Sequence, residues 1–422
     1  MNERTEMMNG MNVHYVQTDK FKTTTFVLHA RAPLYKETAA ARALLANILK
    51  SGTESHPGRK EIRQFLDDLY GASFQSEVTK KGEEHVMSFR METAADAFIA
   101  EGGSVLNEAL TFLTEVMFAP YMPEDNFSQD IFETEKASLL QKIEGIEDDK
   151  IRYANVRLLE EMCADEPFGL HPFGGMKQVE NLTRDDVLAA YKDMLQSNQF
   201  DLYIVGSFHE ETAAKHLAAN VPAVSEAASA AERPQPVTPA SIREVVDEKD
   251  VQQAKLHLGF RIPVKVEDEL YPAAVIANGI FGGFPHSKLF INVREKASLA
   301  YYAASRYEGH KGLVLAMAGV NPSDLQEARN IIEDQLHQLQ NGEFSEEDVE
   351  QTKLLTMNQL REQADSPRGM SEMLYNGEVA GFKPGFEERI AAFQAVTKEE
   401  VTNAANEIEL DTVYILKGKE AD

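Results

Sequence analysis

Histidine and glutamate are the residues of this sequence best suited to metal or acid–base chemistry. The chain contains 11 histidines. A hydrolytic zinc site on one helix needs two histidines four residues apart with a glutamate beside one of them, because both imidazoles then reach one ion and the carboxylate activates its water. His209 and Glu210 adjoin in HEETAAKH, and His216 closes that segment, so these side chains could cluster. No pair has the HExxH or HxxEH spacing, so these histidines are expected at the surface or as helix caps.

Other catalytic arrangements have equally little support. The single cysteine, Cys163, has no matched histidine partner and is expected to be a buried structural thiol. The sequence has no P-loop and no GxSxG motif. A serine or cysteine triad stays open, because its members need not be close in sequence.

Composition narrows the class of protein. A chain of 422 residues predicts two to four domains. Acidic residues outnumber basic ones by 69 to 42, giving a net charge of −27, and no basic run offers a surface for nucleic acid. The acidity suits solubility and would attract basic peptides over long range. No apolar run approaches the ~20 residues of a membrane span, so the sequence predicts no membrane-spanning segment and no membrane partner. Its first residues also lack the pattern of a secretory signal. One cysteine fits a reducing compartment, so the predicted location is cytoplasmic.

The segment ETAAARALLANILKSGTESHP, residues 37–57, has the pattern of a helix that ends at Gly-Thr. Its apolar residues recur at helical spacing and form a stripe for burial: Leu44, Leu45, Ile48 and Leu49. Ala43, Ala46 and Asn47 stand at positions i, i+3 and i+4, so they share another face. A helix would display three cooperating side chains on such a face, yet these residues offer almost no chemistry.

The order of the predicted elements indicates one unit present twice, separated by a linker at 222–241 that is rich in Ala, Ser, Pro and Glu. Thr183 with Asp186 and Thr397 with Glu400 each predict a capped helix start, 214 residues apart, and each helix leads into a Tyr-Ile strand. Paired strands with grouped helices favour an α+β fold over alternating βαβ units. The predicted domains are therefore 1–221 and 242–422.

The order of these segments resembles that of the pitrilysin, insulysin and mitochondrial-processing-peptidase family of zinc metallopeptidases (inverzincins). The quoted helix, followed by LDDLYGASFQSEVTKKGEEHVMSFRM, is similar to the N-terminal half of that family, and NLTRDDVLAAYKDML…DLYIVGSF to the segment that closes this half. FGGFPHSKLFINVREKASLAYYAASRY resembles the hallmark of the second half. The resemblance covers essentially the whole chain, and implies two homologous domains, each a mostly antiparallel or mixed sheet of about six strands packed with helices.

Active members of that family carry H-x-x-E-H on the helix before the Gly-Thr. The equivalent positions here are Ala43, Ala46 and Asn47, and the downstream ligand position falls on Lys142. Alanine has no donor atom, and a lysine ammonium repels a dication. The resemblance therefore implies a degenerate zinc site, with no metal, cofactor or catalytic residue on this chain alone.

Two residues of the second half match family positions with a role in catalysis. Arg294 and Tyr301 correspond to an arginine and a tyrosine that, in members built from paired subunits, reach the partner's zinc site and orient the substrate. A guanidinium and a phenol can both donate to an oxygen that gains charge in the transition state. Without the resemblance, Arg294 would be an exposed helix charge and Tyr301 a packing residue. The strand after the Gly-Ala turn departs from the family at Gln75 and Ser76, but pairing with a peptide backbone does not depend on side-chain identity.

These observations predict a catalytically inactive subunit of a heterodimeric zinc peptidase, which encloses and orients peptides for a zinc-bearing homologous partner. The alternatives are a structural or assembly subunit without a role in proteolysis, and a stand-alone peptide-binding protein that pairs with itself as a homodimer.

Overall fold

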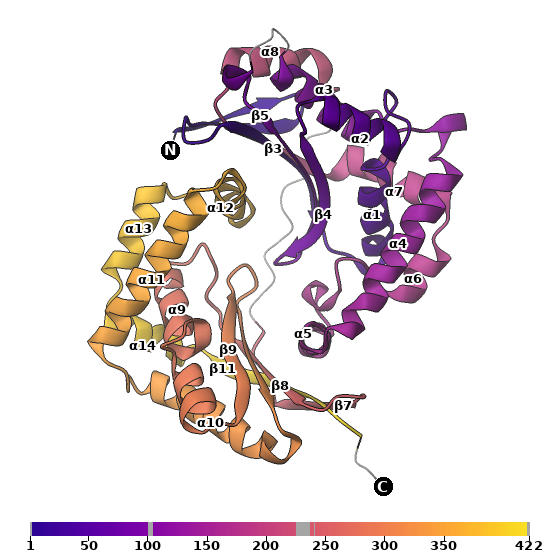
Figure 1. The fold of residues 1–422 in the computed structure, drawn as a ribbon. Coiled ribbons are helices and arrows are strands. Elements are labelled where there is room, and N and C mark those ends of the chain that lie inside the picture. The colour runs from indigo at the N-terminus through magenta and orange to yellow at the C-terminus, as the bar shows by residue number, and fades with distance from the viewer. Residues whose placement is uncertain (1, 100–103, 225–236, 240, 420–422) are drawn as a thin grey trace. The chain divides into compact units, whose positions relative to one another are not determined.

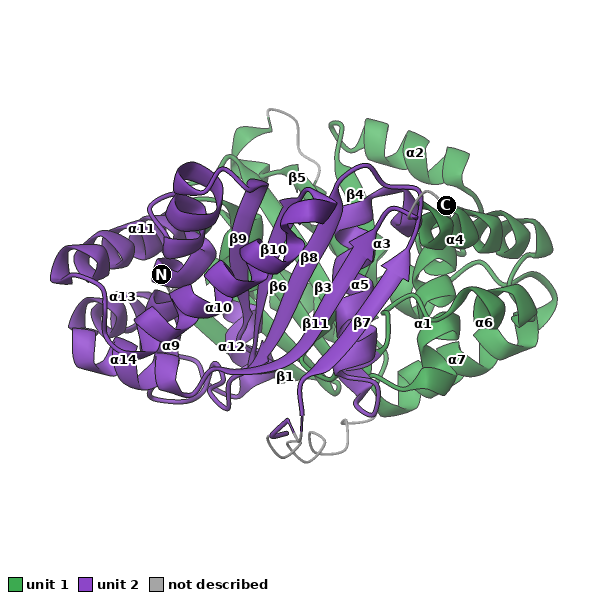
Figure 2. Cartoon of the chain, turned by 90° about the horizontal axis from the view of Figure 1, so that it is seen from below, with its two compact units in different colours: residues 1–145, 170–232, 363–373 green, residues 146–169, 233–362, 374–422 purple. Residues whose placement is uncertain are grey.

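The computed structural model, drawn in Figure 1, describes residues 2–99, 104–224, 237–239 and 241–419. Most of the predicted linker at 222–241 lies outside these residues. The chain divides into two compact units, coloured separately in Figure 2. Unit 1 comprises residues 1–145, 170–232 and 363–373, and unit 2 comprises 146–169, 233–362 and 374–422.

Unit 1 contains a six-stranded mixed sheet in the order β1-β2-β6-β3-β5-β4. The strands are β1 (Asn2–Met8), β2 (Met11–Gln17), β3 (Thr23–Pro33), β4 (Ser73–Lys81), β5 (Glu84–Ala94) and β6 (Gln199–Gly206). The helices are α1 (Lys36–Leu49), α2 (Arg59–Asp68), α3 (Val105–Phe118), α4 (Gln129–Asp148), α6 (Met176–Asn181), α7 (Arg184–Ser197) and α8 (Glu210–Asn220). Successive side chains of a strand alternate between faces, so Phe26, Leu28 and Ala30 of β3 enter the core beneath the helices, whereas Val27 and His29 lie on the opposite face.

Unit 2 contains a five-stranded sheet in the order β7-β11-β8-β10-β9. The strands are β7 (Arg243–Glu248), β8 (Ala254–Arg261), β9 (Ala300–Glu308), β10 (Leu313–Val320) and β11 (Glu409–Lys417). The helices that follow along the chain are α9 (Tyr271–Asn278), α10 (Leu325–Gln340), α11 (Glu346–Ala364), α12 (Pro367–Ala380), α13 (Phe386–Ala395) and α14 (Lys398–Asn406). Residues 363–373, which include the N-terminal part of α12, belong to unit 1. Two π-helical segments, Gly279–Gly283 and Phe290–Lys296, lie between α9 and β9.

The two sheets repeat one topology. β2-β6-β3-β5-β4 of unit 1 corresponds to β7-β11-β8-β10-β9 of unit 2, with one parallel pair followed by three antiparallel pairs in each. The two predicted capping boxes are present: the amide of Thr183 donates to Asp186 and that of Thr397 to Glu400, each at 2.8 Å. The predicted α+β fold with a repeated sheet-and-helix unit is confirmed.

One helix crosses from the first half of the chain to the second sheet. α5 (Lys150–Met162) packs Leu158 and Met162 against Leu315 and Tyr414, and buried Cys163 joins this cluster as predicted. A Cβ atom at Gly259 of β8 would stand 2.6 Å from the sulfur of Met162, so glycine lets the Met162 side chain pack close to the strand.

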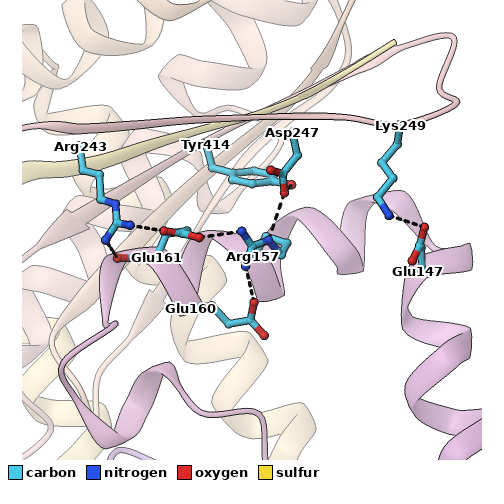
Figure 3. Close-up of polar contacts among 8 residues, drawn as sticks. All are labelled: Glu147, Arg157, Glu160, Glu161, Arg243, Asp247, Lys249 and Tyr414. Carbon is cyan, nitrogen blue, oxygen red and sulfur yellow. Dashed lines mark hydrogen bonds and ion pairs between the residues drawn. The ribbon is translucent and has the colours of Figure 1, made fainter. Parts of the chain in front are cut away.

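Ion pairs fix α5 along the edge strand β7 (Figure 3). Arg157 bridges Glu161 at 2.6 Å and Asp247 at 3.1 Å, and Asp247 also accepts a hydrogen bond from the Tyr414 hydroxyl at 2.9 Å. Arg243 pairs with the same Glu161. Every helix in the described part of the chain is too short or too polar to cross a bilayer.

Candidate functional site

The predicted zinc-site face of α1 is filled rather than bare. Ala43 and Ala46 are each 1% exposed and belong to the hydrophobic core of unit 1, and Asn47 is 5% exposed. A methyl group offers no ligand atom, and protein interiors leave little free volume around such positions. The structure places the three predicted positions together on α1, packed as ordinary core residues.

The neighbouring Arg42 is a buried cation that the sequence pattern did not single out. It is 2% exposed. Its guanidinium donates to Nδ1 of His85 and to Oδ1 of Asn198, both at 3.1 Å, and to the carbonyl oxygens of Ala30 and His85 at 3.3 Å. A buried guanidinium is tolerated only when its donors find acceptors. Arg42 therefore ties α1 to β3, to β5 and to the residue before β6.

The bond from Arg42 assigns the proton of His85. Since the guanidinium can only donate, Nδ1 of His85 is the acceptor, and Nε2 carries the proton that it donates to the carbonyl oxygen of Pro172 at 2.8 Å. Burial and the positive charge of Arg42 lower the pKa of His85 to about 3. This neutral histidine serves the structure, with both ring nitrogens bonded within the protein.

The downstream ligand position also lacks metal chemistry. Lys142 lies on α4 and is exposed. Burial lowers the pKa of Lys50. The nearby carboxylate of Glu135 raises this pKa, and the charges of Lys142 and Arg59 lower it. Glu135 itself is 1% exposed and accepts from Ser51 and Arg59. The buried carboxylate of Glu135 is thus held by an arginine.

Arg294 and Tyr301 lie in unit 2 at opposite ends of the connection into β9. Arg294 is exposed, and its guanidinium carbon lies 4.6 Å from the centre of the Phe290 ring. Tyr301 is 80% exposed, so it is not a packing residue. In the pairing of β9 with β10, Tyr302 faces Gly319 and Ala300 faces Val320, which leaves Tyr301 as the extra residue of a β-bulge. Bulges re-aim a side chain at the edge of a sheet, and β9 is an edge strand. The catalytic role of both residues stays a prediction.

His171 and His216 bond to local partners. His216 contacts the Thr111 hydroxyl at 3.0 Å, and Nδ1 of His171 accepts from the Phe173 amide at 3.1 Å. His209 stands at the start of α8 without a side-chain capping bond. No cluster forms around it and Glu210 in the described residues.

A cationic groove lies on the sheet face of unit 1 that points away from the helices. It encloses about 600 Å³ and is lined by β3, β4, β5 and the N-terminal part of α12, which belongs to unit 1. We define it by its charged residues, which are Glu77, Lys80, Lys81, Arg90, Arg368 and Glu372. Within the described residues β4 pairs only with β5, so β4 is an edge strand, as the family resemblance implies for the strand of Gln75 and Ser76.

Comparison with known proteins places this arrangement in a family. Residues 181–355 match the family model described as the peptidase M16 inactive domain. The chain is 40% identical over 420 residues to the "Probable inactive metalloprotease YmfF" of Bacillus subtilis, covering 100% of this chain and 99% of that protein.

Solved structures agree with the fold. A conserved protein from Enterococcus faecalis V583 superimposes with a TM-score of 0.92 at 30% identity, covering 100% of both chains. A peptidase M16 inactive domain from Pseudomonas fluorescens gives a TM-score of 0.79 at 19% identity, again over 100% of both chains. Because a relative of this similarity covers its whole length, the chain belongs to the M16 peptidase family, and Ala43 and Ala46 of α1 offer no ligand atom for zinc.

Proposed function

We propose that this chain is a non-catalytic peptidase subunit, which binds extended peptides and orients them for cleavage at the zinc of a homologous partner. The observation that carries the proposal is the contrast between the two units. Unit 1 has core alanines where a zinc site would need ligands, whereas unit 2 presents Tyr301 to solvent from a bulged edge strand.

Peptide binding is supported by the edge of the unit 1 sheet. An edge strand offers unpaired backbone donors and acceptors to an added strand. β4 has such an edge beside a groove of about 600 Å³, a volume typical of ligand sites. Peptide docking therefore needs no side chain from the lost metal site.

The contribution to catalysis is assigned to Arg294 and Tyr301. Removing a hydrogen-bond donor that is aimed at a developing oxyanion lowers kcat by a factor on the order of 10²–10³. Because Tyr301 is 80% exposed, truncating it is expected to leave the free energy of unfolding within about 0.5 kcal/mol. Loss of activity without loss of stability separates a catalytic contribution from a structural one.

The test is co-expression with homologues that retain H-x-x-E-H, followed by assays on a fluorogenic peptide library. The mixture is expected to cleave peptides that neither protein cleaves alone. Arg294→Ala and Tyr301→Ala should each lower kcat/KM of the mixture by about 10²-fold. Lys296→Ala and Tyr35→Ala, which truncate an exposed cation and a tyrosine 54% exposed, are the matched controls.

The outcomes distinguish the alternatives. A reconstituted activity that is unchanged in both variants would favour a subunit with only a structural role. A self-associating chain that binds peptides and recruits no zinc-bearing homologue would favour the stand-alone binding protein.

A further inference from the structure

The charge of the groove in unit 1 is opposite in sign to that of the protein. The sequence carries a net charge of −27. The groove is lined by four cationic side chains and two carboxylates, listed above, and thus has a local excess of two positive charges. His29 adds none near neutral pH, because burial lowers its pKa to about 4. A local reversal of sign in so acidic a chain points to an anionic occupant.

The sheet register sets Arg90 at the floor of this groove. Gln75 of β4, Arg90 of β5 and Val27 of β3 face one another across the three strands. Gln75 accepts from the Arg90 guanidinium at 2.8 Å through its neutral amide oxygen. In the described part of the chain no carboxylate lies within ion-pair distance of Arg90, so its charge is not neutralised by a direct partner.

The carboxylates of the groove are engaged by the other cations. Glu372 pairs with Lys81, and Glu77 lies 3.8 Å from Arg368. Burial and the positive charge of Arg368 lower the pKa of Arg90, against the opposing effect of Glu77, Glu92 and Glu372, so the two guanidinium groups repel each other. An added carboxylate would relieve this repulsion and accept bidentate hydrogen bonds from a planar guanidinium.

We propose that Arg90 and Arg368 bind a carboxylate of an extended peptide, so that this chain selects acidic peptides. The inference rests on the proposed peptide-binding function and adds the class of peptide. It opposes what net charge alone predicts, because a field of −27 would favour basic peptides.

The test measures direct binding by the full chain, without a partner subunit. Fluorescence anisotropy compares three labelled, otherwise identical peptides that carry Glu, Gln or Lys at each of three alternate positions. The Glu peptide is expected to bind about tenfold more tightly than the Gln peptide, and the Lys peptide more weakly than both. Raising the ionic strength should narrow the gap between Glu and Gln peptides, because the difference is electrostatic.

Variants assign the preference to the groove. Arg90→Gln and Arg368→Gln are each expected to remove most of the tenfold preference while leaving the affinity for the Gln peptide unchanged. Arg90→Lys should restore part of it, since a lysine keeps the charge without the planar fork. Arg63→Gln, which removes an exposed cation from α2 of the same unit, is the control for net charge and should behave as the wild type.

The two proposals fail differently. Equal binding of the Glu and Gln peptides, a preference for the Lys peptide, or a preference that survives both glutamine variants overturns the selection of acidic peptides and leaves peptide binding intact. If none of the three peptides binds, peptide binding by this chain fails as well.

Discussion

Replacing Arg42 by methionine tests whether a buried cation now organises the former zinc-site helix. The substitution keeps most of the side-chain volume but removes the donors to His85 and Asn198, each bonded at 3.1 Å. An orphaned buried acceptor costs about 1–3 kcal/mol, so two cost about 4 kcal/mol. Burying the methionine returns about 2 kcal/mol. The expected net loss in the free energy of unfolding of unit 1 is about 2 kcal/mol.

A reporter confined to unit 1 makes this loss measurable. The sequence has no tryptophan, so Phe118→Trp in α3 gives a single fluorescent probe that packs against the core of unit 1. Urea titrations in this background compare Arg42→Met with Arg63→Met, whose exposed site should change the free energy by less than 0.5 kcal/mol.

A double-mutant cycle completes the test. His85→Leu leaves Arg42 buried with one acceptor fewer and is expected to cost about 3 kcal/mol. The double variant Arg42→Met/His85→Leu removes the charge and its acceptor together, so it should cost at least 1 kcal/mol less than the sum of the single variants. The reasoning is refuted if Arg42→Met matches Arg63→Met, or if the two single losses simply add.

Three further predictions follow from the described contacts. The free energy of unfolding of unit 1 should fall as the pH drops from about 6.5 towards 4, because His29 and His85 have folded pKa values of about 4 and 3, so the unfolded chain binds more protons. Each histidine contributes at most about 1.4 kcal/mol per pH unit. A urea midpoint that is constant from pH 7 to 5 would contradict this prediction. Thr183→Ala and Thr397→Ala should each cost about 1 kcal/mol in their own unit, since equivalent capping boxes are lost, and unequal losses in thermal or urea unfolding would show that the two caps are not energetically equivalent. Ala43→His should destabilise unit 1 by about 1–3 kcal/mol, because the larger side chain overpacks a buried position. Elemental analysis of this variant should give less than about 0.1 zinc per chain, and stoichiometric zinc would contradict the conclusion that core packing fills the former zinc-site face.

The parts of the fold that depend on local sequence were predictable. Helical periodicity identified α1, and Thr183 and Thr397 identified two helix starts that the structure shows as capping boxes. The spacing of these starts also indicated the duplication, which the matching strand orders confirm. Such features depend on neighbours within four residues, so the sequence contains them directly.

Features that depend on distant partners were not predictable. Arg42 is a helix residue whose partners His85 and Asn198 lie 43 and 156 residues away. The burial of His85 was not predicted for the same reason, because its partners Arg42 and Pro172 lie 43 and 87 residues away. The bulge at Tyr301 arises from pairing with β10, and a sequence alone does not show which residue of a strand is left unpaired.

The position of α5 has a consequence for any attempt to divide the molecule. A cut anywhere between residues 222 and 241 leaves α5 with the N-terminal fragment, although its apolar face and its ion pairs belong to the sheet of unit 2. The C-terminal fragment alone would expose Leu315 and Tyr414 to water and would be prone to aggregate. The two fragments produced together should instead associate without a covalent link, because α5 of the N-terminal fragment can pack against the sheet of the C-terminal fragment.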